Sequence, residues 1–238
     1  MVAALGETTA GPVLPRLLDH LLESAEGRRI LKERPRINTS TVDMGALARL
    51  PENTFGHTYV TWLERCGVTP DTRDPVRLSL VQNGIIALVL TSITQVHYID
   101  DPELAYVMQR YRECHDFYHA LCGMPVSVEY ELALKVFEFA NLGLPSAALS
   151  TAAVVRLNAA KRTRFFSEYV PWALRCGSAA QSMITVYWEE RWAQDLGELK
   201  KELGVWDPPP PKWRRQLSEA KEAVTRKVQA AELGGQVR

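Results

Sequence analysis

The chain has 238 residues, of which 46% are hydrophobic, and its 28 basic residues balance its 28 acidic ones. The apolar content suffices for a buried core and argues against global disorder. The zero net charge, with no basic stripe between aromatic residues, argues against a dedicated nucleic-acid binder. Four cysteines without a C-x-x-C pair are typical of reduced thiols in a mitochondrial, nuclear or cytosolic compartment.

Apolar residues recur at helical spacing along most of the chain. Asp101 is expected to cap the helix that begins at Pro102, and Gly123 with Pro125 should end it. The pattern predicts further helices over residues 14–32, 42–50, 57–66, 127–141, 146–158, 163–175 (interrupted by Pro171) and 179–203.

Residues 78–99 contain no Asp, Glu, Lys or Arg. Polar residues nevertheless interrupt this segment, so it lacks the unbroken apolar run of a membrane-spanning helix. We expect a buried helix, a strand or an interfacial segment there.

The chain divides by composition near its C-terminal end. Residues 1–206 form the predicted helical domain, and residues 207–211, Asp-Pro-Pro-Pro-Pro, are a stiff polyproline linker. Residues 212–238 form a charged helical tail with seven basic and three acidic residues. This tail is interpreted as a solvated extension, and docking on an anionic membrane or a partner is the alternative.

The most informative motif is His115-Asp116-Phe117-Tyr118-His119. Helix positions i and i+4 differ by about 40° around the axis and about 6 Å along it, so both imidazoles project from one face, with Asp116 beside them. A second helix beginning near Ser127 could fold back and present Glu131 to the same point. The four residues form a candidate divalent-metal site.

Two other interpretations of the motif were weighed. In one, Asp116 and His119 merely pair at i,i+3 on a solvated helix face. In the other, the motif belongs to a metalloprotease, but Asp replaces the Glu of His-Glu-x-x-His and is one methylene shorter, so a protease is disfavoured.

The chain resembles the family of the fourth Coq protein of mitochondrial ubiquinone biosynthesis, and its fungal members most. The resemblance spans residues 5–211. It is carried by residues 27–37, 68–73 and 98–107, by the metal motif with Glu131, and by residues 143–145 and 187–192.

The resemblance implies an all-α protein, peripheral on the matrix side of the mitochondrial inner membrane and associated with other ubiquinone-synthesis proteins. It implies that His115, Asp116, His119 and Glu131 bind a divalent metal, usually assigned as Zn²⁺. The implied reaction is C1-decarboxylation of 4-hydroxy-3-methoxy-5-polyprenylbenzoate by a metal-dependent lyase.

Four protein ligands in a tetrahedron would close the site, whereas catalysis needs an open position. We therefore expect expanded coordination, or release of one carboxylate as acid or base, and Glu131 is the first candidate because it comes from a separate helix. Asp116 is the second candidate catalytic carboxylate. Residues 142–157 are the candidate lining for the polyprenyl tail.

Two further functions stay open at this point. The protein could be a non-catalytic scaffold that binds prenylated intermediates and organises the ubiquinone-synthesis complex. It could also be a non-haem iron oxygenase that uses His115, His119 and one carboxylate.

The sequence departs from the family in two places. The family's mitochondrial presequence is not visible in this chain, so the chain is expected to be a shortened form. Residues 78–97 are an apparent insertion between segments that are contiguous in the family. A retained intron is our hypothesis, because a whole number of codons preserves the reading frame.

Overall fold

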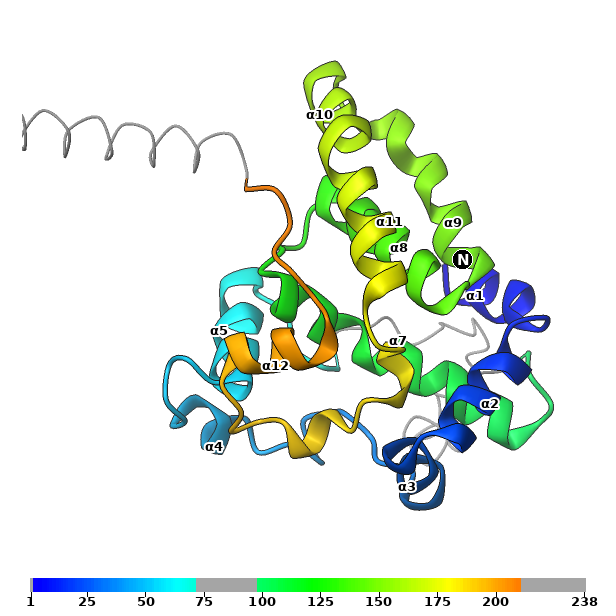
Figure 1. The fold of residues 1–238 in the computed structure, drawn as a ribbon, viewed down its shortest axis with the longest axis vertical. Coiled ribbons are helices and arrows are strands. Elements are labelled where there is room, and N and C mark those ends of the chain that lie inside the picture. Colours follow the sequence, from blue (N-terminus) through cyan, green and yellow to red (C-terminus); the bar gives the residue numbers. More distant parts are fainter. Residues whose placement is uncertain (1, 72–97, 211–238) are drawn as a thin grey trace, which may run out of the picture. The chain divides into compact units, whose positions relative to one another are not determined.

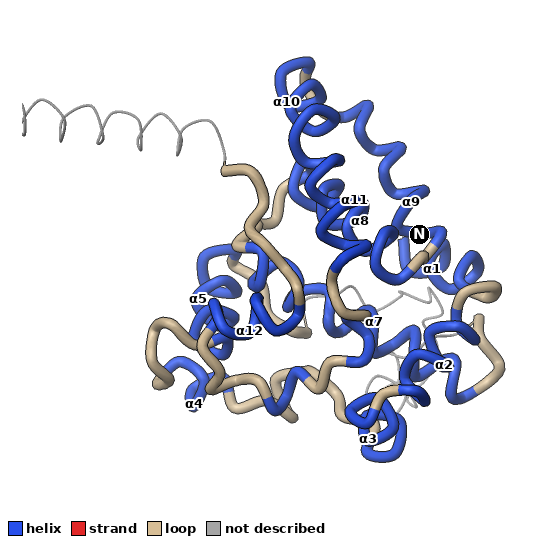
Figure 2. The backbone as a smooth tube through the Cα atoms, viewed as in Figure 1, coloured by secondary structure: helices blue, strands red, loops and turns tan. Residues whose placement is uncertain are grey.

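The computed structural model describes residues 2–71 and 98–210, and this part of the chain consists of helices joined by loops (Figure 2). Within it there is no strand, and Thr54 and Asp195 form an isolated bridge. The all-α prediction is therefore confirmed. The apparent insertion at 78–97 and the charged tail at 212–238 lie outside the described residues.

The chain forms two compact units, Met1–Asp207 and Pro208–Arg238. The first unit ends where the polyproline run begins, and it holds all the helices of the described residues (Figure 1). No helix of residues 2–71 and 98–210 has the length and apolarity needed to cross a bilayer.

The predicted helix over residues 14–32 is two helices that meet at Ser24. Ser24 is extended, with φ −87° and ψ 140°, and its hydroxyl accepts from the Gly27 amide at 3.1 Å. A Cβ at Gly27 would lie 2.2 Å from the Leu21 carbonyl oxygen, so the corner depends on glycine. The N-terminal helices are α1 (Val2–Ala10), α2 (Leu14–Glu23), α3 (Ala25–Glu33), α4 (Met44–Ala48) and α5 (Phe55–Cys66).

Two long helices follow, α7 (Pro102–Cys122) and α8 (Val128–Leu142). The Asp101 carboxylate accepts from the amides of Glu103 and Leu104 at 2.8 and 3.1 Å, as the sequence predicts. Gly123 ends α7 in the left-handed region at φ 62°.

The last part of the described chain is less regular than predicted. Helix α9 (Pro145–Ser150) continues as a 3₁₀ helix over Thr151–Arg156, and a π-helical turn at Phe165–Tyr169 joins α10 (Ala159–Arg164) to α11 (Val170–Ala179). The predicted long helix over 179–203 is wrong. Only α12 (Leu196–Leu203) and two 3₁₀ turns, Met183–Thr185 and Trp188–Glu190, occur after α11.

Tertiary hydrogen bonds replace helical ones between α11 and α12. The Tyr187 amide donates to Glu26 Oε2 at 2.9 Å. Arg110, fully buried on α7, donates to the Val186 carbonyl at 3.2 Å and pairs with Glu189. Because these two backbone groups are paired with distant side chains, and the turns between them close local hydrogen bonds, a continuous helix is not needed there.

Helix α7 passes through both apolar cores of the unit. Its N-terminal half contributes the side chains of Tyr106, Val107, Met108 and Tyr111 to a core shared with α2 and α3. Its C-terminal half, from Cys114 onward, packs in the larger core with α5, α8, α11 and α12. The helix is therefore fixed along nearly its whole length.

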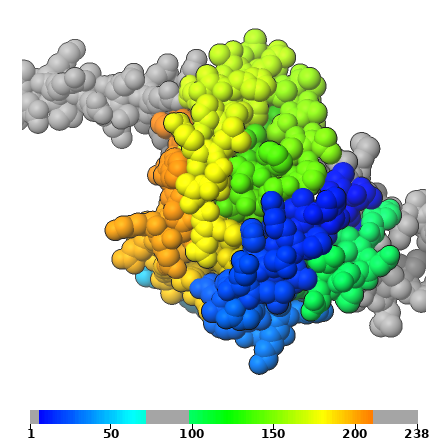
Figure 3. All heavy atoms as spheres, turned by 45° about the vertical axis from the view of Figure 1, so that its right-hand side comes forward, coloured from blue at the N-terminus to red at the C-terminus, as the bar shows by residue number. Residues whose placement is uncertain are grey.

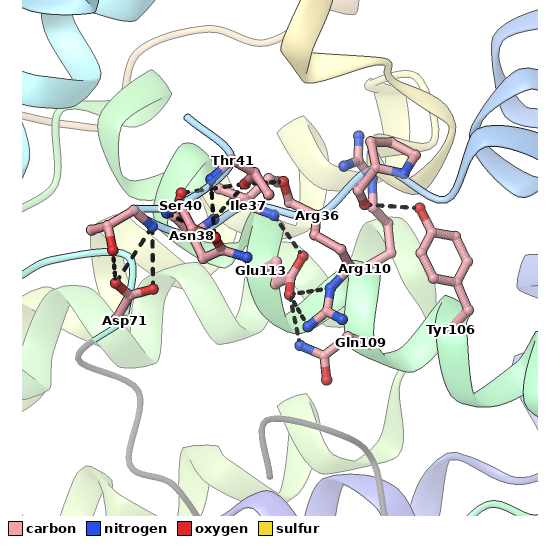
Figure 4. Close-up of polar contacts among 12 residues, drawn as sticks. Arg36, Ile37, Asn38, Ser40, Thr41, Asp71, Tyr106, Gln109, Arg110 and Glu113 are labelled. Carbon is pink, nitrogen blue, oxygen red and sulfur yellow. Dashed lines mark hydrogen bonds and ion pairs between the residues drawn. The ribbon is translucent and has the colours of Figure 1, made fainter. Parts of the chain in front are cut away.

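A polar cluster ties the segment after α3 to α7 (Figure 4). Glu113 is buried and accepts from Arg36 Nε at 2.8 Å, from Gln109 Nε2 at 2.9 Å and from the Ile37 amide at 2.9 Å. These charge-assisted bonds compensate for the burial of the carboxylate and hold α7 two residues before His115.

Helices α8 and α11 approach closely at Gly177. A Cβ there would lie 2.5 Å from the Phe137 carbonyl oxygen, a backbone atom that could move away only if α8 shifted.

We therefore expect Gly177→Ala to destabilise the protein by roughly 1–2 kcal/mol, because the cost of overpacking exceeds the gain in helix propensity. Urea unfolding measures the change. The control is Ser178→Ala at the neighbouring exposed position of α11, which should not lower the midpoint. An unchanged midpoint in Gly177→Ala would contradict the close contact.

Candidate metal centre

Helix α7 presents His115 and His119 one turn apart, as the sequence predicts. Their ring centroids are 4.8 Å apart and the rings are perpendicular. The His119 side chain is 1% exposed and that of His115 is 17% exposed. The pair thus lies at the edge of the core, with one imidazole inside it and the other nearer its surface.

Glu131 enters from the first turn of α8. The five residues between the helices, including Gly123 at a positive φ, reverse the chain so that α8 returns beside α7. One Glu131 oxygen lies 3.0 Å from His119 Nε2 and the other lies 3.4 Å from His115 Nε2. The ligand atoms of the three residues lie within 4.8 Å of one another.

The tautomer of His119 follows from its second nitrogen. Nδ1 lies 3.1 Å from the Met124 carbonyl oxygen, which can only accept, so Nδ1 carries the hydrogen in the neutral ring. Nε2 then holds a lone pair that is buried, has no hydrogen bond and faces the Glu131 carboxylate. Two electron-rich atoms in this arrangement need a cation or a proton between them. The donor set therefore fits a divalent metal ion.

His115 is oriented in the same way by a carboxylate. Its Nδ1 lies 2.5 Å from Glu138 Oε1, and Glu138 is fully buried. The other Glu138 oxygen accepts from Lys135 Nζ at 2.6 Å and from the Tyr111 hydroxyl at 2.7 Å. Glu138 thus fixes the ring so that Nε2 points to Glu131, an arrangement typical of metal-binding histidines.

The two carboxylates are held ionised. Burial acts to raise the pKa of the Glu131 carboxyl, but the two imidazoles beside it lower the pKa by more, so it falls far below its usual value. Burial likewise opposes ionisation of Glu138, yet Lys135 and His115 bring its pKa down to about 2. Burial and Lys135 lower the pKa of His115, while Glu138 and Glu131 raise it by more.

Trp62 on α5 forms one wall of the centre. Its ring stacks on His119 at 5.3 Å between centroids, and its Nε1 donates to the Met124 carbonyl at 2.7 Å. The same carbonyl accepts from His119, so one backbone oxygen positions both rings.

Asp116, the fourth predicted ligand, lies on α7 next to His115 and is half-buried. It is not in the three-residue group formed by His115, His119 and Glu131. Its role as a ligand stays a prediction.

Four residues around the candidate site were not predicted from the sequence: Tyr111, Lys135, Glu138 and Trp62. Helical spacing offered a signal for the first three, because Lys135 and Glu138 follow Glu131 at i+4 and i+7, and Tyr111 precedes His115 by one turn. Trp62 comes from a helix far away in sequence and had no such signal.

The geometry of the three residues defines what the site can do. Two imidazoles and one carboxylate suit Zn²⁺ or Fe²⁺ and leave open positions for an exogenous ligand. The Glu131 side chain is 33% exposed, so the centre is reachable from the side of α8.

The comparisons with known proteins agree on one family. The profile for "Coenzyme Q (ubiquinone) biosynthesis protein Coq4" matches residues 1–97 and 91–209. The chain is 61% identical over 227 residues to a Laccaria bicolor protein described as "Ubiquinone biosynthesis protein COQ4, mitochondrial", covering 95% of this chain and 70% of that protein. It is 60% identical over 228 residues to the protein of the same description from Coprinopsis cinerea, covering 95% and 72%.

A solved structure shares the fold. A crystal structure of a protein from Nostoc punctiforme PCC 73102, provisionally named for ubiquinone biosynthesis, superimposes with a TM-score of 0.56 over 81% of each chain at 19% identity. The helical architecture is therefore found in an experimental structure. The family profile and the fungal relatives together show that this chain belongs to the Coq4 family of coenzyme Q (ubiquinone) biosynthesis proteins.

Proposed function

We propose that the protein is a metal-dependent lyase that removes the C1 carboxylate of 4-hydroxy-3-methoxy-5-polyprenylbenzoate in ubiquinone biosynthesis. The observation that carries this proposal is the buried, unbonded His119 Nε2, which converges with His115 and Glu131 on one point. A metal ion bound at this point would satisfy the buried Nε2 atom and the carboxylate together.

His115, His119 and Glu131 would hold the metal, with zinc as the first candidate. A bound divalent metal supplies Lewis acidity that offsets negative charge on substrate oxygens. Because three ligands leave an open position, we propose that Asp116 serves the substrate rather than closing the coordination shell.

The reaction replaces a carbon–carbon bond with a carbon–hydrogen bond. A proton is delivered to the ring carbon that bears the carboxylate, and the electrons of the breaking C–CO₂ bond return to the ring as CO₂ leaves. Asp116 is the proposed proton donor. Glu131, the first candidate from the sequence, is assigned to the metal instead, because it lies beside both imidazoles and its carboxyl is held ionised. Residues 142–157 remain the proposed lining for the polyprenyl tail.

The cellular setting follows from the same family. The fungal relatives are named mitochondrial. We propose that this protein acts at the matrix side of the inner membrane as a peripheral protein, together with other ubiquinone-synthesis proteins.

Turnover tests the proposal directly. The purified protein, loaded with Zn²⁺, Mn²⁺ or Fe²⁺, is incubated with a prenylated 4-hydroxy-3-methoxybenzoate, and CO₂ and the polyprenyl methoxyphenol are measured. We expect CO₂ and the polyprenyl methoxyphenol in a one-to-one ratio, and we expect the same yield in the presence and in the absence of oxygen. Release that requires oxygen and Fe²⁺ would favour the oxygenase, and no release with a metal-loaded protein would favour the scaffold.

The ligand assignment predicts metal loss. His119→Ala and Glu131→Gln should each lower the metal content of the purified protein several-fold while helix content stays the same, because the buried core around α7 is apolar. Elemental analysis and circular dichroism measure the two quantities. The control is His57→Ala, a half-buried histidine on α5 outside the three-residue group. Full metal occupancy in both ligand variants would disprove the assignment.

The role of Glu138 predicts a weaker effect on the same property. Glu138→Gln keeps the shape but loses the charge that orients His115, so the metal Kd should rise about 10–100-fold. A competing chelator measures the Kd. The matched control is Glu129→Gln, another buried carboxylate of α8 that pairs with Arg164 and not with a histidine. Equal Kd changes in the two variants would mean that Glu138 acts only through stability.

A further inference from the structure

One end of the first unit carries uncompensated positive charge. Residues 142–167 contain no Asp or Glu and four basic residues, Arg156, Lys161, Arg162 and Arg164. Arg164 pairs with the buried Glu129. The other three are exposed and form no ion pair within the described residues 2–71 and 98–210.

The same end exposes apolar side chains. Val155 is 74% exposed and Phe166 is 55% exposed, and Ala159 and Ala160 between them are exposed as well. In Figures 1 and 3, α10 lies at the upper end of the unit, between the 3₁₀ helix that follows α9 and the π-helical turn that precedes α11. We call residues 155–166 the α10 end.

We propose that the α10 end docks the protein on an anionic lipid bilayer. Exposed Val155 and Phe166 would enter the boundary between headgroups and acyl chains, and Arg156, Lys161 and Arg162 would lie against the anionic headgroups. Basic residues that flank exposed apolar ones are the composition of membrane-surface segments. The complementarity rests on charge and exposure in this chain and does not depend on the metal chemistry.

The α10 end is joined to the metal centre. Arg164 donates through Nε to Glu129 Oε1 at 2.7 Å, and Glu129 is only 2% exposed. Glu131 follows two residues later on α8, so the helix that anchors the α10 end also carries one of the residues that would hold the metal.

Vesicle binding by the full chain tests the proposal. Co-sedimentation is measured with vesicles of phosphatidylcholine alone and of phosphatidylcholine mixed with an equal amount of phosphatidylglycerol. The wild type should bind the anionic vesicles, and Arg156→Gln/Lys161→Gln/Arg162→Gln should bind about 100-fold more weakly, because each basic residue near the surface contributes about tenfold or less. Wild-type protein that does not bind anionic vesicles would overturn the proposal.

Two control variants locate the docking surface. Arg49→Gln/Arg65→Gln/Lys201→Gln removes three exposed charges around α4, α5 and α12, away from α10 in Figure 1, and should bind as the wild type does. Lys212→Gln/Arg214→Gln/Arg215→Gln removes three charges from the C-terminal tail. Loss of binding in the tail variant, with normal binding in the α10 variant, would assign docking to the tail and overturn the proposal.

The apolar contribution has its own signature. Val155→Ser/Phe166→Ser should abolish the part of the binding that persists at high salt, where the electrostatic part is screened. Metal content and circular dichroism should stay at wild-type values in all variants, which separates a docking defect from loss of the metal site or the fold. If the α10 variants bind vesicles normally but fail to join the other ubiquinone-synthesis proteins, the surface is a protein interface and the bilayer proposal is wrong.

Discussion

The burial of polar side chains on α7 is the constraint on which the rest of the structure depends. Arg110, Glu113 and His119 are all buried on this helix. A buried charge or imidazole destabilises the fold unless it finds a partner, so each one dictates where another segment must lie. Glu113 holds the loop after α3, and Arg110 holds the irregular segment before α12. His119 holds the turn that leads into α8 through the Met124 carbonyl.

These partners show that the candidate metal site depends on the fold of the whole unit and not on one sequence motif alone. Helix α7 alone places the two histidines one turn apart. The orientation of each ring is fixed at Nδ1, by the Met124 carbonyl for His119 and by Glu138 on α8 for His115. Glu131 then meets both rings because α8 returns beside α7. With Nδ1 of His119 facing the Met124 carbonyl and Nδ1 of His115 facing Glu138, Nε2 of each ring lies toward Glu131. A proton could neutralise such an arrangement, but a divalent cation satisfies all three ligands together.

The chemistry and the α10 end share a structural element. The first turn of α8 carries Glu129, which anchors α10 through Arg164, and Glu131, which completes the metal centre. Under the two proposals, one helix, α8, connects the surface that docks on the bilayer to the residues that hold the metal.

Local sequence determined the elements that have strong local signals. Asp101, Pro102 and Gly123 set the bounds of α7, and the i,i+4 spacing of His115 and His119 set the first two ligands, because both depend only on helix geometry. A second helix after Gly123 offered Glu131 as a further candidate ligand, and the resemblance to the family supported it. The break at Ser24 and the irregular segment between α11 and α12 could not be predicted. The bond from the Gly27 amide to the Ser24 hydroxyl, and the long-range bonds made by Glu26 and Arg110, compete there with a favourable helical pattern.

Only the tertiary structure decided what surrounds the ligands. Trp62 reaches His119 from α5, and the separation of Asp116 from the three-residue group depends on how α8 packs beside α7. The periodicity of a sequence indicates on which face of its helix a residue lies. It does not indicate which other helix that face packs against. That choice is made by packing and by the pairing of buried polar groups, which are properties of the folded chain.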